Sequence, residues 1–283
     1  MSNDEQIAYW NGDAGRKWAQ RDAMMARMLA PVAEALMEHA QIDDARAVLD
    51  VGCGGGSETL MLAERLGADA CVLGVDVSAP LLEVARAHLA SVGDVGKGVG
   101  FVQADASSHD FGTQQFDLLF SRFGVMFFEE PGQAFAHLRN AMQAKGRLAF
   151  ACWQSLSNNP WTALPLTAAL SVLPSPPKPK PRSPGPFAFA EPDYIHSLLQ
   201  DAGWRNVQVT PHVISMDWEG RDGFEATARE LVNTGPVGRL LIDADAATRD
   251  AVHRAAAKVL TPYFHDNTLS LPGAVWLVTA DNA

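Results

Sequence analysis

The stretch Val48-Leu49-Asp50-Val51-Gly52-Cys53-Gly54-Gly55-Gly56 decides the fold of this 283-residue chain. It reads as a short apolar strand followed by a glycine-rich turn, and residues 58–64 then have the composition of a helix. Glycine permits positive φ angles and lets a ligand approach the backbone, while free N–H groups at a helix start favour negative charge. A strand, a glycine-rich turn and a helix in this order predict the mouth of a nucleotide-type pocket.

The spacing of the glycines separates two kinds of nucleotide site. A dinucleotide fingerprint G-x-G-x-x-G that begins at Gly52 requires glycine at position 57, where this chain has Ser57. The chain instead has Asp50-x-Gly52-x-Gly54-x-Gly56. That pattern resembles motif I of the class I S-adenosylmethionine (SAM) dependent methyltransferases.

The segments that follow alternate between strand and helix patterns. Residues 71–76 are a second apolar run that ends in Asp76, and an acid in that place can accept both hydroxyl groups of a ribose. The apolar stripe after it predicts a helix from Pro80 to about Ala90. The other predicted elements are strands at 99–102, 116–120 and 148–153, and a helix from Pro131 that carries Met142.

In order and spacing, residues 46–153 are similar to the methyltransferase domain of the ubiquinone and menaquinone biosynthesis enzymes. The resemblance implies an α/β fold with a Rossmann-like, mostly parallel sheet of seven strands and helices on both faces. It also implies SAM as cofactor and S-adenosylhomocysteine (SAH) as product, with Asp105 accepting from the adenine amino group. The expected cofactor-binding residues are Trp10, Gly52, Cys53, Gly54, Asp76, Val77, Asp105, Ala106, Ser121 and Arg122.

The segments around this core are expected to complete one methyltransferase domain over residues 1–283. Gly12, Gly15 and Pro31 are expected to interrupt or kink the N-terminal helices, and a methionine-rich stripe is expected to pack against the sheet. Helices are predicted at 224–232 and 246–260. The expected segments are an N-terminal helical cover (1–45), a Pro-rich insertion with an extended loop (154–189), a helix and strand (190–211), a helical substrate-side insertion (212–271) and the final strand (272–283).

Composition excludes several classes of function. The net charge of −11 argues against a nucleic acid partner, because phosphate binding needs clustered lysine and arginine. The N-terminus is polar and acidic, and no apolar run approaches the roughly 18 residues of a membrane span, so neither a signal peptide nor a membrane association is expected. The three cysteines lack the spacing of a disulfide framework, so a location in the cytoplasm is expected. The histidines are scattered without metal-ligand spacing, so no metal site is predicted.

The acceptor of the methyl group is expected to be a hydrophobic or aromatic small molecule. Each residue of the expected pocket can equally be a core residue, and no general base stands out, so catalysis is expected mainly from positioning. For Arg122, two roles remain open: an anchor for an anionic group, or a brace against one of the many acids. The expected pocket residues are Tyr9, Phe123, Met126, Phe127, Trp153 and Trp161.

Three other functions remain open for a chain with this pattern. An NAD-dependent Rossmann oxidoreductase is disfavoured by Ser57 and by the segment around Asp105. A transferase that moves another group, such as aminopropyl, needs a decarboxylated donor. A non-catalytic interaction or regulatory protein of the same fold has no need of the intact glycine loop. The oligomeric state is not predicted.

Overall fold

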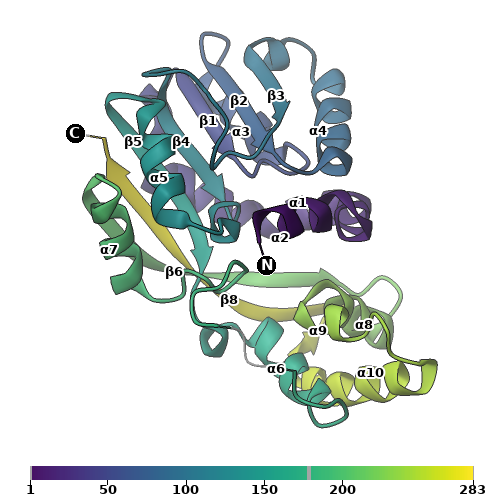
Figure 1. Cartoon of the computed structure of the whole chain (residues 1–283). Helices are drawn as coiled ribbons and strands as arrows, with labels where there is room; N and C mark the ends of the chain where they lie inside the picture. The colour runs from purple at the N-terminus through teal and green to yellow at the C-terminus, as the bar shows by residue number, and fades with distance from the viewer. Residues whose placement is uncertain (1, 177–179, 283) are drawn as a thin grey trace. The chain divides into compact units, whose positions relative to one another are not determined.

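The computed structural model describes residues 2–176 and 180–282, and it divides the chain into two compact units (Figure 1). Unit 1 comprises Met1–Trp153, Pro181–His212 and Trp276–Ala283, and unit 2 comprises Gln154–Lys180 and Val213–Val275. The single domain expected over the whole chain stays a prediction.

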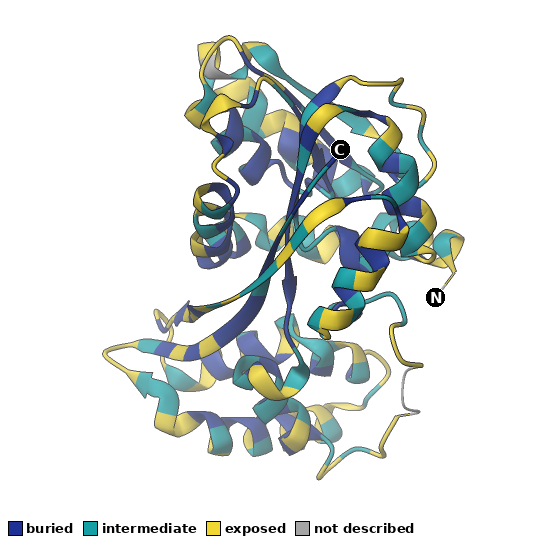
Figure 2. Cartoon of the chain, turned by 90° about the vertical axis from the view of Figure 1, so that its left-hand side faces the viewer, coloured by how far each residue is buried: buried dark blue, intermediate teal, exposed yellow. Residues whose placement is uncertain are grey.

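One mixed sheet has the strand order β3-β2-β1-β4-β5-β8-β6, and the pairs among β1 to β5 are parallel. The central strands are buried, as expected for parallel strands covered by helices (Figure 2). The strands are β1 (Ala47–Val51), β2 (Cys71–Asp76), β3 (Val99–Gln103), β4 (Phe116–Arg122), β5 (Met142–Trp153), β6 (Arg205–Glu219), β7 (Phe264–His265) and β8 (Thr268–Asp281).

The expected α/β fold is confirmed, but the sheet formed by the described residues has eight strands instead of seven. The additional strand, β7, pairs with the start of β8 in an antiparallel hairpin. Its two-residue turn, Asp266-Asn267, has φ angles of 48° and 57°. Asp and Asn tolerate this left-handed conformation, which two-residue hairpin turns require, and a two-residue strand is too short to give a hydrophobic pattern.

Strand β5 begins earlier than the sequence predicts. Met142, expected on the preceding helix, is the first residue of β5 and pairs with Phe116. The register then shifts, because Leu118 pairs with Arg147, and Lys145 between them has φ of 63°. An irregular strand of this kind lacks the regular alternation of apolar and polar residues from which a strand is predicted, so the sequence does not predict a strand at its start.

The helices of unit 1 follow the predicted order. α3 contacts β2, α4 contacts β2 and β3, and α5 contacts β5 and α7. They are α1 (Asn3–Asn11), α2 (Asp13–His39), α3 (Ser57–Leu66), α4 (Ala79–Ser91), α5 (Pro131–Asn140) and α7 (Pro192–Asp201), with 3₁₀ turns η1 (Ile42–Asp44), η2 (Gly93–Gly98) and η3 (Val125–Phe127).

The N-terminal segment breaks only at Gly12, and α2 continues through Gly15 and Pro31. A proline inside a helix removes one hydrogen bond, but the residues after it, Val32 and Leu36, are fully buried and stabilise the helix. The expected stripe is confirmed, since α2 contacts β5 and α4. Its buried members are Met25, Met28, Leu29, Val32, Ala33, Leu36 and Met37.

Unit 2 brings together most of both segments expected as insertions, while residues 181–189 and 212 belong to unit 1. α6 packs against α10 and α9, and α10 packs against α8 (Figure 1). The predicted helices α8 and α10 are confirmed, whereas α6 was not predicted, because two of its ten residues are prolines. Its elements are η4 (Leu156–Asn158), α6 (Pro160–Ala169), α8 (Phe224–Thr234), α9 (Pro236–Leu240), α10 (Ala246–Leu260), η5 (Thr261–Tyr263) and β7.

The proline-rich stretch 174–186 forms neither helix nor strand in its described residues, and 177–179 lie outside the described part. Strand β6 extends past residue 211 and β8 begins before residue 272, the limits expected for these segments, and each strand contributes residues to both units. Within the described residues, no helix is long and apolar enough to cross a bilayer.

Candidate functional site

The candidate site lies at the carboxyl ends of β1, β2 and β4, in unit 1. The strand order reverses between β1 and β4, and ligands of open α/β sheets bind at such a switch point. A Cβ added to Gly52 would lie 2.6 Å from the Cα of Gly124, so the turns after β1 and β4 touch. Only glycine permits this approach.

Gly54 marks the open side of the glycine-rich turn. Its φ is 54°, and a Cβ built there would meet no atom of the described residues within 4 Å. Gly56, by contrast, packs closely, because a Cβ there would lie 2.7 Å from Phe101 Cζ. A ligand that approaches this turn therefore finds free space at Gly54.

Asp76 ends β2 directly beside this open space. Its Oδ2 accepts the N–H of Gly54 at 2.9 Å, and its Oδ1 accepts the N–H of Ser78 at 2.8 Å. Burial raises the pKa of Asp76, and these backbone hydrogen bonds oppose the rise. Each carboxylate oxygen has about two lone pairs and uses one here, so both oxygens can accept a further hydroxyl group.

Asp50 and Cys53 lie behind the turn. The Oδ2 of Asp50 accepts the hydroxyl of Thr59 at 2.6 Å, which ties the end of β1 to α3. Burial raises the pKa of the Asp50 carboxyl to about 7. Burial also raises the pKa of the Cys53 thiol, so this thiol is neutral and a poor nucleophile.

Arg122 was expected either to bind an anionic group or to brace the loop against an acidic residue, and the structure bears on both roles. Its Nη2 lies 2.7 Å from Oε1 of Glu58, in an ion pair with side-chain exposures of 13% and 7%. The brace is therefore present. However, Nε and Nη1 of Arg122 are buried and have no hydrogen-bond partner among the residues that the structure describes. Two donor nitrogens of this buried cation thus lack a partner, which makes Arg122 a candidate for binding an anion.

Helix α2 supplies a residue that sequence reasoning missed. Asp22 packs against the glycine turn so closely that a Cβ on Gly55 would lie 1.9 Å from its Oδ1. Burial raises the pKa of Asp22, while the charges of His88 and Arg122 lower it and that of Glu58 raises it. An acidic residue in the middle of a predicted helix gives no local signal of this position.

Helix α1 lies against the ends of β2 and β3. The Ser78 hydroxyl donates to the Trp10 carbonyl at 2.8 Å, and Asn11 Nδ2 donates to the Val77 carbonyl at 2.9 Å. Asn3 Nδ2 donates to Oδ2 of Asp105 at 2.6 Å. The helix thus contacts the segments expected to hold the ribose and the adenine.

Aromatic rings of the expected site fall into two groups in unit 1. The Trp10 ring makes edge-to-face contacts with Tyr9 and Phe127, at centroid distances of 5.3 and 5.5 Å. Phe123 and Trp153 stack in parallel at 4.4 Å. Phe123 has φ of 67°, which is rare for an aromatic residue and marks a strained turn after β4.

Other predicted site residues lie deeper or elsewhere. Ser121 is fully buried, and its hydroxyl donates to the Val51 carbonyl at 2.7 Å. Met126 and Ala106 are also buried. Trp161 belongs to unit 2, where its ring nitrogen donates to Asn159 Oδ1 at 3.1 Å. Their roles in binding stay predictions.

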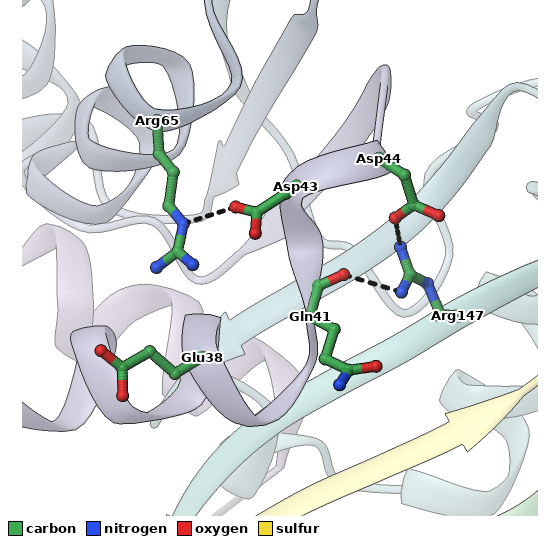
Figure 3. Close-up of a pocket in the computed structure, with 6 residues that line it drawn as sticks. All are labelled: Glu38, Gln41, Asp43, Asp44, Arg65 and Arg147. Carbon is green, nitrogen blue, oxygen red and sulfur yellow. Dashed lines mark hydrogen bonds and ion pairs between the residues drawn. The ribbon is translucent and has the colours of Figure 1, made fainter.

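A separate pocket of about 470 Å³ opens near the start of β1, away from the glycine turn (Figure 3). Arg65 pairs there with Asp43, and Arg147 pairs with Asp44. Each of these two arginines already has a carboxylate partner, so neither is an unpaired cation for an anionic ligand. No group of three or more metal-ligating side chains occurs in the described residues.

The residues at the switch point fit SAM. Gly54 leaves open space, Asp76 keeps acceptor capacity for ribose hydroxyls, and Arg122 keeps two donors for a carboxylate. Metal ligands are not needed for any of these contacts.

Comparison with known proteins agrees with this geometry. A model of the methyltransferase domain matches residues 48–146. Aklanonic acid methyltransferase DauC from Streptomyces sp. (strain C5) is 27% identical over 129 residues, which cover 46% of this chain and 58% of that protein. The ubiquinone/menaquinone biosynthesis C-methyltransferase UbiE from Marinomonas sp. (strain MWYL1) is 33% identical over 36% of this chain and 40% of that protein.

The chain thus matches 58% and 40% of the length of these two curated relatives. Among solved structures, phosphoethanolamine N-methyltransferase 2 from Haemonchus contortus, in complex with phosphomonomethylethanolamine and SAH, has a TM-score of 0.54. It is 17% identical, and the match covers 89% of this chain and 52% of that chain. At this identity the likeness extends to the fold alone.

Proposed function

Since residues 48–146 belong to the methyltransferase domain family of the class I, SAM-dependent type, we propose that this protein transfers a methyl group from SAM to a small molecule. The observation that carries the proposal is the pairing of open space at Gly54 with the Asp76 carboxylate at the switch point of the sheet. Such a pairing suits a nucleoside that lies against the backbone and hydrogen-bonds through its ribose.

In this proposal each part of the cofactor has its own residues. Asp76 accepts the ribose hydroxyl groups, the backbone of Gly52, Cys53 and Gly54 lies against the ligand, and Arg122 receives the methionine carboxylate. The adenine lies between Val77, Asp105 and Ala106. Trp10 and Ser121 complete the set of cofactor-binding residues expected from the sequence.

Bound SAM supplies a methyl group on a sulfonium sulfur, and the carbon of this methyl group is already reactive toward a nucleophile. The protein therefore acts mainly by holding donor and acceptor in line, which can contribute up to about 7–11 kcal/mol toward the barrier. The Trp10 ring contacts those of Tyr9 and Phe127, and α1 is bound to Val77 and Ser78, so we propose that these rings help to exclude water from the bound cofactor. No general base is assigned.

The proposed acceptor is a hydrophobic or aromatic metabolite. Phe123 follows β4 and Trp153 ends β5, and their stacked rings give the carboxyl edge of the sheet an aromatic surface that suits a planar acceptor. The names of two relatives, an aklanonic acid methyltransferase and a quinone biosynthesis methyltransferase, favour the same acceptor class. The acceptor atom is left open.

The test is transfer of label from methyl-labelled SAM to a panel of phenols and quinols. Asp76→Ala is expected to weaken SAM binding about 100-fold, because two hydrogen bonds to a charged group are lost. Asp69→Ala is the matched control, since Asp69 is exposed and lies before the opposite end of the same strand. Equal affinities for the two variants would refute the ribose assignment, and NADH binding would favour an oxidoreductase.

A further inference from the structure

The Asp105 carboxylate has no acceptor capacity left for another donor. Its Oδ1 accepts the N–H of Ser107 at 2.9 Å, and its Oδ2 accepts the hydroxyl of Ser108 at 3.2 Å. The Ser107 hydroxyl lies 2.8 Å from both oxygens, and Asn3 Nδ2 lies 2.6 Å from Oδ2. Four donors thus occupy the roughly four lone-pair positions of one carboxylate.

The electrostatics of Asp105 agree with this count. Partial burial raises its pKa, but the hydrogen bonds from Ser107, Asn3 and Ser108 outweigh burial, and the pKa is lowered. Asp76 differs, because its donors are backbone N–H groups alone, chiefly those of Gly54 and Ser78, and they leave acceptor capacity on the carboxylate. The ribose end of the proposed site is therefore ready for a ligand, while the adenine end is already filled.

Asn3 is held at Asp105 by the start of helix α1. Ser2 caps this helix, and its side chain and that of Glu5 form a reciprocal capping box. The backbone N–H of Asn3 also donates to Oε2 of Glu129 at 2.5 Å. The backbone of Asn3 is thus fixed by the helix start and Glu129, and its carboxamide is fixed by Asp105.

A carboxamide –NH₂ and the exocyclic –NH₂ of adenine are the same kind of donor: each is planar and offers two N–H groups. We propose that Asn3 is an intramolecular competitor for the adenine-binding carboxylate, so that α1 closes the base end of the site when no nucleoside is bound. This inference rests on the proposed function, in which Asp105 receives adenine. Binding of adenine then requires that Asn3 leave Asp105, and the backbone around α1 shifts with it.

The experiment titrates SAH calorimetrically into the wild-type protein and into Asn3→Ala, Asp105→Ala and the double variant. Asn3→Ala is expected to bind SAH about fivefold tighter, which corresponds to roughly 1 kcal/mol for one released hydrogen bond. In the Asp105→Ala background, Asn3→Ala is expected to change nothing, because the contested acceptor is gone. Asp4→Ala is the control, as an exposed change on the neighbouring residue of α1.

A second ligand repeats the test without a change to Asp105. S-inosylhomocysteine carries a carbonyl oxygen where SAH carries the amino group, so Asn3→Ala is expected to tighten its binding less than it tightens the binding of SAH. If Asn3→Ala binds SAH no tighter than the wild-type protein, the competition is refuted while the proposed function stands. If SAH binds neither the wild-type protein nor Asn3→Ala, the proposed function fails, and the competition fails with it.

Discussion

Substitution of Gly54 by alanine separates backbone strain from ligand binding. Gly54 has φ of 54°, and a Cβ there would meet no described atom within 4 Å, so folding suffers no clash. Alanine in the left-handed region costs about 1 kcal/mol relative to glycine. For a chain of this size that lowers the melting temperature by about 2–4 °C.

The effect on binding is expected to be much larger. The added methyl group would occupy the space through which the proposed ligand approaches the turn. Steric crowding of this kind costs about 1–3 kcal/mol, which raises the Kd for SAH roughly 5- to 150-fold. Calorimetric titration with SAH measures this change, and a thermal melt of the free protein measures the strain.

Gly93 provides the matched control. It has φ of 62°, and a Cβ there would likewise meet nothing within 4 Å in the described structure, but it lies in η2 before β3. Gly93→Ala is expected to lower the melting temperature as much as Gly54→Ala and to leave the Kd unchanged. If Gly54→Ala binds SAH as tightly as Gly93→Ala does, the ligand does not approach at Gly54 and the reasoning is wrong.

Two further substitutions test the charges behind the turn. Burial raises the pKa of Asp50 from 3.8 to about 7. Between these two pH values the folded protein keeps a proton on Asp50 that the unfolded chain releases. The free energy of unfolding therefore falls as the pH rises from about 4 to 7, by up to about 1.4 kcal/mol per pH unit. Asp50→Asn is expected to remove this decline. If urea unfolding gives the same difference in the free energy of unfolding between wild type and Asp50→Asn at pH 5 and at pH 8, the raised pKa of Asp50 is contradicted. Glu58→Ala leaves the buried Arg122 guanidinium unpaired at a cost of about 3 kcal/mol, and Glu58→Ala/Arg122→Met is expected to regain part of the lost melting temperature. A double variant that melts no higher than Glu58→Ala would argue against this ion pair.

The order of the core elements could be predicted from local patterns. Each of the strands from β1 to β4 is a short apolar run next to a turn residue or an acid, and the glycine spacing at 52, 54 and 56 distinguishes the type of turn. These signals need no knowledge of the tertiary structure. The prediction fails where pattern and structure diverge, as in the irregular start of β5 at Met142 and the proline-containing helix α6.

The contacts around the candidate site were less predictable. Asn3 and Asp105 are separated by 102 residues, and Asp22 reaches the turn at Gly55 from a long helix. Nothing in the local sequence of α1 or α2 distinguishes these polar side chains from exposed ones. Tertiary packing alone brings Asn3 to Asp105 and Asp22 to the glycine turn, so these two contacts are known only from the structure.

The central claim is that the switch point of this sheet binds SAM and its product. The most direct measurement is calorimetric titration of the wild-type protein with SAH and, separately, with NADH. The account predicts one-to-one binding of SAH in the micromolar range and no heat of binding with NADH. Binding of NADH without binding of SAH would contradict it.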